Sequence, residues 1–385
     1  MPIIKSLLDN DLYKFTMQQC VLHQFPSAEA EYKLIVRSKV NINHLAKPLV
    51  DEIDYLCGLQ INKNELDYLE AIRFIKKDYV AFLEDFRLKR RYVNVSQGKD
   101  QLEVRIKGPW VQTILFEVPL LAILSELYMG GIEATNLISF KTLENKLKSI
   151  QHTPDFHFAD FGTRRRASAC WQQMVVSICE SKCPASMFIG TSNVHLAMKY
   201  GVKAIGTMAH EFIQAGQGLG VTRLSDSQKF MFETWAKEYR GDLGIALTDT
   251  IGMDAFLKDF DPYLAKLYDG CRQDSGDPIQ WGKKLIAHYK SMGIDPMTKS
   301  AVFSDGLDFI KAKEILDHFR GRIKVSFGIG TNLTNDVGKK PLSIVIKLVG
   351  LNGNPVAKIS DEPGKVICED EGFLTYLKQV YGVRS

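Results

Sequence analysis

The second part of the chain repeats one pattern, in which a short apolar run ends in small or acidic residues and is followed by a helical segment. Strands that alternate with helices are typical of βαβ units around a parallel sheet. Such units, recurring within less than half of a 385-residue chain, favour a closed or nearly closed α/β barrel, with a doubly wound open sheet as the alternative. The seven apolar runs are His157–Phe161, Ala185–Ile189, Ala204–Thr207, Gly244–Leu247, Gly270–Arg272, Ser300–Phe303 and Lys324–Phe327.

The segments on either side of this region mix helix and strand patterns. Leu12–Phe25 has helical periodicity, and Pro119 is expected to open an apolar helix that reaches Met129. Asn352-Gly353 between two alternating runs predicts a β-hairpin. The other expected elements are strands at Glu31–Ser38, Leu102–Lys107, Leu342–Val349 and Val356–Ser360, and two short helices within Glu65–Leu88.

Composition argues against several classes of protein. The formal net charge is only +4, without a basic stripe, so nucleic acid is not an expected partner. The seven cysteines include no CxxC pair, which disfavours a disulfide framework or a zinc site and fits a reducing compartment. No apolar run reaches the roughly 18 residues that span a membrane, and the first residues lack the apolar region of a signal peptide. We therefore expect a cytoplasmic protein without a membrane contact.

Polar signatures directly follow the predicted strands. Because the carboxyl ends of parallel strands meet at one edge, the loops that follow them converge there and carry the functional site. Turn chemistry alone does not explain so many polar loops in series. The signatures lie at residues 160–166, 190–193, 206–211, 248–250, 272–277, 304–306 and 328–332.

One of these loops has the composition of a phosphate site. Gly328, Gly330 and Thr331 follow a strand and lead toward a helix, so that backbone N–H groups can surround an anion. An ordinary glycine-rich turn is the alternative. The loop is neither a P-loop nor a dinucleotide fingerprint, which disfavours a Rossmann-type dehydrogenase.

Acidic residues recur at equivalent loop positions. Arg272, Asp274 and Asp277 form a compact group whose two carboxylates suggest a Mg²⁺ held through water and substrate oxygens. The guanidinium in this group suits a carboxylate or a phosphate. Asp249 and Asp305 follow neighbouring strands in the same way. A helix N-cap with a surface ion pair is the alternative.

Three other loop residues are candidates for the site. Arg164 opens a run of three arginines that would attract a strongly anionic substrate, although at least one of the three is expected to be structural. Phe161 offers a ring for stacking or belongs to the core. His210 stands at an expected helix start, where the helix dipole suits a histidine that binds phosphate or attacks it; a structural histidine is the alternative. No HExxH or GxSxG motif supports a hydrolase.

Six motifs, taken together and in order, resemble those of the nicotinate phosphoribosyltransferase family. They span about residues 9 to 335, and the set as a whole is specific to that family. The motifs are DLYKFTM at Asp11–Met17, DFGTRRR at Asp160–Arg166, GTSN at Gly190–Asn193, GTMAHE at Gly206–Glu211, DSGDP at Asp274–Pro278 and FGIGTN at Phe327–Asn332.

The resemblance implies an activity and the roles of several residues. The enzyme would join nicotinate to phosphoribosyl pyrophosphate, giving nicotinate mononucleotide and pyrophosphate in NAD biosynthesis. ATP hydrolysis would drive this reaction through a transient phosphohistidine at His210. Tyr13 and Phe161 would enclose the pyridine ring, with Tyr13 reaching into the site of a second subunit of a homodimer. The complete expected set comprises His210, Asp249 and Asp274 for catalysis, Asp274 and Asp277 for Mg²⁺, and Tyr13, Phe161, Arg164, Ser192, Thr207, Arg272, Asp305, Gly306, Gly328, Gly330 and Thr331 for substrate binding.

The family also implies a fold class and a domain division. The expected fold is an irregular type II phosphoribosyltransferase α/β barrel with an N-terminal α/β domain that C-terminal strands complete. We place the N-terminal domain at residues 1–117 and the barrel at 118–340. Residues 341–385 are expected to return to the N-terminal domain as strands and a helix.

Substrate choice depends on one position. Relatives that use nicotinamide tend to carry an aspartate where this chain has Ser192, and an aspartate there would repel the carboxylate of nicotinate. Nicotinamide phosphoribosyltransferase is one alternative, and a quinolinate enzyme, which lacks the phosphohistidine step, is another. A non-catalytic nucleotide-binding protein on the same barrel is the third, although such a protein would be expected to lose His210 or the aspartates.

Overall fold

The computed structural model describes residues 2–130 and 137–383 of the chain. These residues form two compact units, each assembled from segments distant in the sequence. The first unit contains the described residues within 1–27, 32–206 and 329–346, and the second contains those within 28–31, 207–328 and 347–385.

The first unit contains most of the N-terminal half of the chain. Its strands β2 and β3 pair antiparallel from Val93↔Ile106 to Gln97↔Leu102, and β1 lies on the other side of β3. Buried and exposed residues alternate along β3, so one face of this sheet covers the core. The strands are β1 (Glu29–Val36), whose first three residues belong to the second unit, β2 (Val93–Gln97), β3 (Leu102–Pro109), β4 (Phe158–Asp160) and β5 (Phe188–Thr191). The helices are α1 (Leu12–Gln24), α2 (Ala46–Cys57), α3 (Lys63–Glu70), α4 (Lys77–Glu84), α5 (Trp110–Thr113), α6 (Glu117–Met129), α7 (Leu137–Ile150), α8 (Ala169–Lys182), α9 (Val194–Tyr200) and α16 (Thr331–Thr334).

Helix α6 forms the centre of the first unit's core. The helix was expected to open at Pro119, but it begins two residues earlier, at Glu117. Pro119 lies in the first turn, where proline is tolerated. The helical stretch Trp110–Met129 is long and apolar enough to cross a membrane, yet 83% of its most apolar window is buried within the protein. Such burial is the pattern of a core helix, apolar on all sides.

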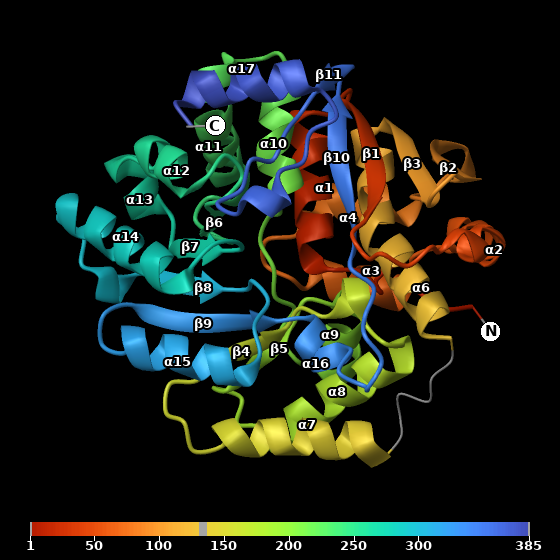
Figure 1. Cartoon of the computed structure of the whole chain (residues 1–385), viewed down its shortest axis with the longest axis horizontal. Coiled ribbons are helices and arrows are strands. Elements are labelled where there is room, and N and C mark those ends of the chain that lie inside the picture. The colour runs from red at the N-terminus through yellow and green to blue at the C-terminus, as the bar shows by residue number, and fades with distance from the viewer. Residues whose placement is uncertain (1, 131–136, 384–385) are drawn as a thin grey trace. The chain divides into compact units, whose positions relative to one another are not determined.

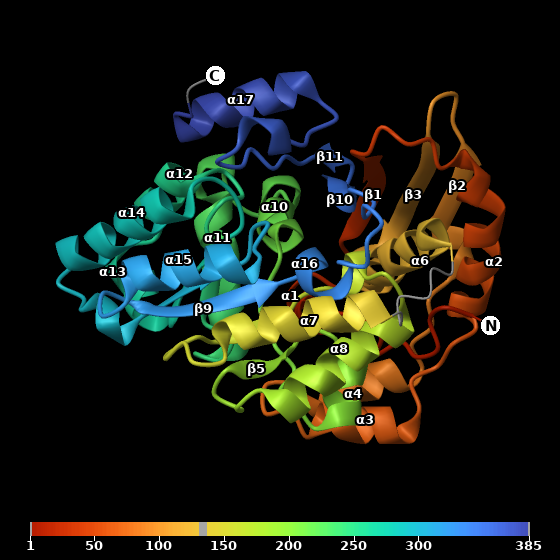
Figure 2. The ribbon, with the colours of Figure 1, turned by 60° about the horizontal axis from the view of Figure 1, so that its bottom comes forward.

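Strands β4 and β5 form a parallel pair in the first unit. Helix α8 follows β4, and Figure 2 shows α7 beside α8. The ring of Phe140 in α7 meets the ring of Trp171 in α8 edge to face, with the ring centroids 5.4 Å apart. The strand predicted at Ala204–Thr207 is wrong, since that segment forms only a parallel bridge between Ala204 and Thr191. Its partner β5 ends at Thr191 because Asn193 already caps α9.

The second unit contains four parallel strands that pair in sequence order, β6 with β7, β7 with β8 and β8 with β9. Helices α14 and α15 run alongside these strands in Figure 1. The strands are β6 (Ile245–Leu247), β7 (Gly270–Gln273), β8 (Ser300–Phe303) and β9 (Lys324–Ile329), whose last residue belongs to the first unit. The helices are α10 (His210–Gly218), α11 (Ser227–Tyr239), α12 (Met253–Asp259), α13 (Pro262–Leu267), α14 (Pro278–Ser291), α15 (Phe309–Phe319) and α17 (Glu371–Tyr381).

Aromatic rings fill the space between these strands and their helices. The ring of Phe303 lies 5.2 Å from that of Trp281 and 5.7 Å from that of Phe319. Gly282 packs so closely here that a Cβ atom would overlap the ring of Phe319. The strand ends are thus held on a rigid layer.

The C-terminal part forms the predicted hairpin and joins the N-terminal sheet. Strand β10 (Ile344–Leu351) turns at Asn352-Gly353, both at positive φ, and pairs with β11 (Asn354–Pro355). The strand predicted at Val356–Ser360 is wrong, because that segment forms only an isolated antiparallel bridge between Lys358 and Ile367. Near the start of β10, the Ser343 carbonyl accepts a hydrogen bond of 2.8 Å from the backbone N–H of Arg37. The expectation that C-terminal strands complete the N-terminal sheet is confirmed.

Candidate active site

A buried histidine and two aspartates meet in the second unit. His210 is the first residue of α10, and its Nε2 atom lies 2.8 Å from Oδ1 of Asp249 and 3.7 Å from Oδ2 of Asp274. One ligand atom from each of the three lies within 4.8 Å of the others. The two aspartates come from the loops after β6 and β7, as the convergence of strand ends predicts.

The second carboxylate oxygen of Asp249 is also engaged. Its Oδ2 atom lies 2.8 Å from Nζ of Lys358 and accepts a hydrogen bond of 2.6 Å from Ser275. Both Asp249 and Lys358 are buried. Asp249 therefore joins the histidine to a buried cation that belongs to the C-terminal part of the chain.

Burial decides the protonation state of this group. Burial lowers the pKa of His210 to about 4, even though Asp249 acts in the opposite direction, so the imidazole is neutral at neutral pH. Burial alone would raise the pKa of Asp249, but His210 and Lys358 hold it well below its ordinary value. Burial likewise opposes ionisation of Asp274, whereas Arg272 and His210 lower the pKa of that carboxyl. Two ionised carboxylates thus flank a neutral histidine.

Arg272 and Thr207 lie around the same group. Arg272 is in β7, and its guanidinium lies 3.9 Å from Oδ2 of Asp274 and donates to the Met208 carbonyl at 3.4 Å. Ser304 donates to the other oxygen of Asp274 at 2.8 Å. Thr207 donates to the carbonyl of Ile245 at 3.3 Å. The Oδ2 atom of Asp274 has only long polar contacts, at 3.7 Å to His210 and 3.9 Å to Arg272.

Other predicted residues of the second unit lie in different settings. Asp277 is exposed and accepts a hydrogen bond from the backbone N–H of Gln280, as the N-cap of α14. Asp305 is paired with Lys365, whose Nζ lies 2.8 Å from both carboxylate oxygens. Gly306 is exposed at φ 57°, and Gly328 is buried in β9.

A second polar group lies in the first unit, at the start of α1. Ser192 donates to Oδ1 of Asp11 at 2.7 Å. The guanidinium of Arg164 lies 4.0 Å from Asp11 and 3.7 Å from Glu117, and this side chain is 40% exposed. Tyr13 is buried beside them in α1. Of the three consecutive arginines, Arg164 and Arg165 are partly exposed, whereas Arg166 is buried.

Arg166 has a structural setting instead. Its side chain is only 1% exposed and binds both carboxylate oxygens of Asp9, at 2.6 and 2.8 Å. Asn193 donates to the same carboxylate at 2.7 Å. The expectation that at least one of the three arginines is structural therefore fits Arg166, which ties the loop after β4 to the N-terminal segment.

Phe161 and the glycine-rich loop meet in the first unit. The backbone N–H of Phe161 donates to the Ile329 carbonyl at 2.9 Å. A Cβ atom on Gly330 would lie 3.0 Å from the Phe161 carbonyl oxygen, so this close approach favours glycine. Thr331 follows as the first residue of α16 and is partly exposed.

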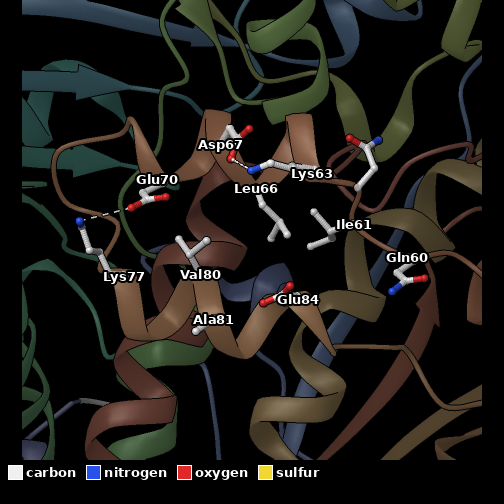
Figure 3. A pocket seen from close by; sticks show the side chains of 11 residues that line it. Gln60, Ile61, Lys63, Leu66, Asp67, Glu70, Lys77, Val80, Ala81 and Glu84 are labelled. Atoms are coloured by element: carbon white, nitrogen blue, oxygen red, sulfur yellow. Dashed lines mark hydrogen bonds and ion pairs between the residues drawn. The ribbon is translucent and has the colours of Figure 1, made fainter.

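A cavity of about 600 Å³ lies elsewhere in the first unit, between α3 and α4 (Figure 3). The ion pairs at its rim, Lys63–Asp67 and Lys77–Glu70, are solvent-exposed and contribute little. None of the predicted site residues lines it. The residues around it are Gln60, Ile61, Asn62, Lys63, Leu66, Asp67, Glu70, Lys77, Val80, Ala81 and Glu84.

Sequence reasoning missed three residues of these groups. Lys358 and Lys365 follow the C-terminal hairpin, far along the chain from the aspartates that they pair with. Asp11 stands in a recognised motif but was not singled out. For Lys358, the sequence offers one local signal, namely its apolar neighbours Ala357 and Ile359, and this signal does not reveal the partner of the lysine.

Comparisons with known proteins agree along the whole chain. The family model described as "Nicotinate phosphoribosyltransferase (NAPRTase) family" matches residues 156–385, and that of the N-terminal domain of the same family matches residues 8–125. A protein of Chromobacterium violaceum named nicotinate phosphoribosyltransferase is 54% identical, over 99% of this chain and 98% of its own length. One of Xylella fastidiosa with the same name is 51% identical, over 100% of this chain and 99% of its own.

Solved structures give the same result. The crystal structure of nicotinate phosphoribosyltransferase from Vibrio cholerae matches with a TM-score of 0.94 and 40% identity, covering 100% of this chain and 95% of that one. The structure from Porphyromonas gingivalis matches with a TM-score of 0.93 and 35% identity, covering 99% of this chain and 100% of that one. The fold class expected from the sequence is confirmed.

Proposed function

Because the chain belongs to the nicotinate phosphoribosyltransferase family, we propose that it joins nicotinate to phosphoribosyl pyrophosphate in an ATP-dependent reaction. The products are nicotinate mononucleotide and pyrophosphate, together with ADP and phosphate, and the pathway is NAD biosynthesis from nicotinate. The observation that carries this proposal is the buried His210–Asp249 hydrogen bond at the start of α10.

We assign the two ring nitrogens of His210 different tasks, because an ionised Asp249 can only accept a hydrogen bond. Nε2 donates its proton to Asp249, which leaves the lone pair of Nδ1 as the nucleophile. Nδ1 attacks the γ-phosphorus of ATP, an N–P bond forms, and the P–O bond to ADP breaks. The ring gains positive charge while Nε2 keeps its proton, and the ionised Asp249 stabilises that charge. Hydrolysis of the phosphohistidine later releases phosphate.

The first-unit residues fit the recognition of a planar anionic ring. We assign stacking on the pyridine ring to Tyr13 and Phe161. The accessible guanidinium of Arg164 offsets the charge of Asp11 and offers donors for the carboxylate of nicotinate. Ser192 contributes a hydroxyl at the same place.

The second-unit loops fit the binding of phosphoribosyl pyrophosphate. Arg272 supplies positive charge beside Asp274, and the carboxylate of Asp305 suits the ribose hydroxyls once Lys365 turns to a phosphate. Thr207 contacts nicotinate in this proposal. The remaining assigned contacts are the backbone groups of Gly306 and Gly328 in this unit and of Gly330 and Thr331 in the first unit.

The donor set of the second unit fits Mg²⁺ held largely through water. Asp249 has both oxygens engaged, whereas Asp274 keeps an oxygen with only long contacts and is partly accessible. We assign Asp274 as the protein ligand, with Asp277 as a second ligand through water, although it caps α14. Bound there, the ion would neutralise pyrophosphate charge in the transition state.

Nicotinamide remains the second candidate substrate because of Asp11. Its carboxylate lies 2.7 Å from the Ser192 hydroxyl and could accept a hydrogen bond from an amide. Arg164 favours nicotinate instead. We also propose a cytoplasmic homodimer and the three domains 1–117, 118–340 and 341–385.

Trapping of the phosphoenzyme tests this proposal. The wild-type protein is incubated with [γ-³²P]ATP and Mg²⁺, quenched in alkali and mapped by mass spectrometry. We expect an acid-labile phosphoryl group on His210 that phosphoribosyl pyrophosphate and nicotinate discharge as product forms. Label on another residue, or none at all, would refute the assigned mechanism.

A further inference from the structure

The backbone around Lys358 is fixed more firmly than that of an ordinary surface loop. The side-chain amide of Gln217 in α10 exchanges two hydrogen bonds with the backbone of Ala357, at 2.9 and 2.7 Å. Lys358 and Ile367 exchange two backbone hydrogen bonds of 2.9 Å. Two different elements therefore hold the backbone on either side of the lysine.

A third attachment comes from the loop that carries the catalytic aspartate. The backbone N–H of Ile359 donates to the carbonyl of Thr250 at 2.8 Å. Thr250 directly follows Asp249, so the lysine and the aspartate are attached to each other through their backbones as well as their side chains. Their relative position is consequently predetermined.

The side chain of Lys358 is buried, with 4% of the residue exposed, and it has a direct ionic partner. Its Nζ atom lies 2.8 Å from Oδ2 of Asp249, whose Oδ1 lies 2.8 Å from Nε2 of His210. Ser275 also donates to Oδ2, and Ser360 lies 2.9 Å from the hydroxyl of Ser275. The carboxylate is therefore oriented by contacts on Oδ2, while Oδ1 faces the histidine.

A buried carboxylate is stable as an anion only beside a compensating charge. The neutral imidazole of the resting enzyme stabilises the carboxylate through a hydrogen bond, whereas Lys358 supplies the full opposite charge. During phosphoryl transfer from ATP, the N–P bond forms on Nδ1 and the ring becomes positive, so the step needs an ionised Asp249 in the correct rotamer.

We propose that Lys358 is a positioning residue for phosphorylation of His210, which acts by holding Asp249 ionised with Oδ1 directed at Nε2. This inference rests on the proposed function, because it concerns the same phosphoryl transfer. Lys358 does not touch the reacting atoms in this proposal. Direct binding of ATP phosphate by the lysine is the competing explanation that the experiment separates.

The experiment measures single-turnover phosphorylation by [γ-³²P]ATP with Mg²⁺, together with the Kd for ATP. We compare wild type with Lys358→Met, Lys358→Arg, Asp249→Asn and the double variant. The control is Lys284→Met, which removes an exposed lysine that is paired with Asp254 in the same unit. We expect the rate constant of Lys358→Met to fall about 10- to 100-fold, as for loss of a charge-assisted contact, while the Kd for ATP changes less than about threefold.

Coupling to Asp249 gives the decisive result. If the lysine acts through the aspartate, the double variant is no slower than Asp249→Asn alone, and Lys358→Arg recovers much of the rate because it restores the charge. The double variant also removes both buried charges, so it keeps the test possible if Lys358→Met fails to fold.

Four outcomes would overturn the inference. Multiplicative losses in the double variant, or a raised Kd for ATP with an unchanged rate constant, would show that Lys358 binds substrate directly. Normal phosphorylation of Lys358→Met would show that the lysine has no part in this step while leaving the proposed function intact. No phosphorylation of the wild type would refute the proposed function and this inference with it.

Discussion

Replacement of Arg166 by methionine should destabilise the protein more than any change of an exposed arginine. Arg166 makes two hydrogen bonds to Asp9, at 2.6 and 2.8 Å, and a third to Gln172 at 3.2 Å. Methionine fills much of the same volume but leaves the buried carboxylate of Asp9 without its cation. Removing one partner of a buried ion pair costs about 3 to 5 kcal/mol.

The stability lost on replacing Arg166 by methionine should depend on pH in a defined direction. Although burial opposes ionisation, Arg166 holds the pKa of Asp9 below its ordinary value. In the wild type, Asp9 therefore contributes stability above the unfolded pKa of about 3.9, and this contribution is lost as the pH falls through the lowered folded pKa. Without Arg166, the hydrogen bond from Asn193 remains, but the guanidinium no longer offsets burial, which favours the protonated acid. The difference between wild type and variant should be largest at pH 7 and shrink toward pH 4.

Thermal unfolding followed by circular dichroism measures this effect. With about 2 to 4 °C per kcal/mol for a cooperative unit of roughly 200 residues, the midpoint at pH 7 should fall by about 6 to 20 °C. Arg164→Met is the matched control, because its partners lie at 3.7 and 4.0 Å and its side chain is 40% exposed, so the cost should stay below about 1 kcal/mol. Equal midpoints for the two variants, or a difference that grows at low pH, would refute this reasoning.

Three further outcomes are expected. His210→Ala should lose the stimulation of synthesis by ATP, measured as product formed with and without ATP. Ser192→Asp places a second carboxylate beside Asp11, where two charges 4 Å apart repel by about 4 kcal/mol at an effective dielectric of 20; kcat/KM for nicotinate should fall at least about tenfold relative to nicotinamide. Gly282→Ala should destabilise by about 1 to 3 kcal/mol in urea unfolding, because the added methyl overlaps the ring of Phe319.

Local signals were sufficient for most of the fold. The apolar runs that became β7 and β8 are followed by aspartates that cap the next helices, Asp277 before α14 and Asp308 before α15. Ala204–Thr207 has the same apolar character but lacks a strand long enough to pair with, because β5 ends at Thr191. Strand formation there depends on a partner that the sequence pattern does not reveal.

The candidate site was predictable only where its residues follow strands. Asp249 and Asp274 lie in loops directly after β6 and β7, whereas His210 begins α10 after a segment that forms only an isolated bridge; the fold brings the three together. Lys358 comes from a different part of the chain and is defined by a long-range contact, which no local pattern encodes. The spacing of Asp274 and Asp277 fitted either two metal ligands or a ligand and a helix cap, and cap geometry is visible only in three dimensions.

Product formation is the most direct test of the central claim. Labelled nicotinate and phosphoribosyl pyrophosphate are incubated with the purified protein and Mg²⁺, with and without ATP, beside a parallel reaction with nicotinamide. We expect nicotinate mononucleotide at a rate that ATP increases, and little product from nicotinamide. Product from nicotinamide alone, or no product from either substrate, would contradict the account.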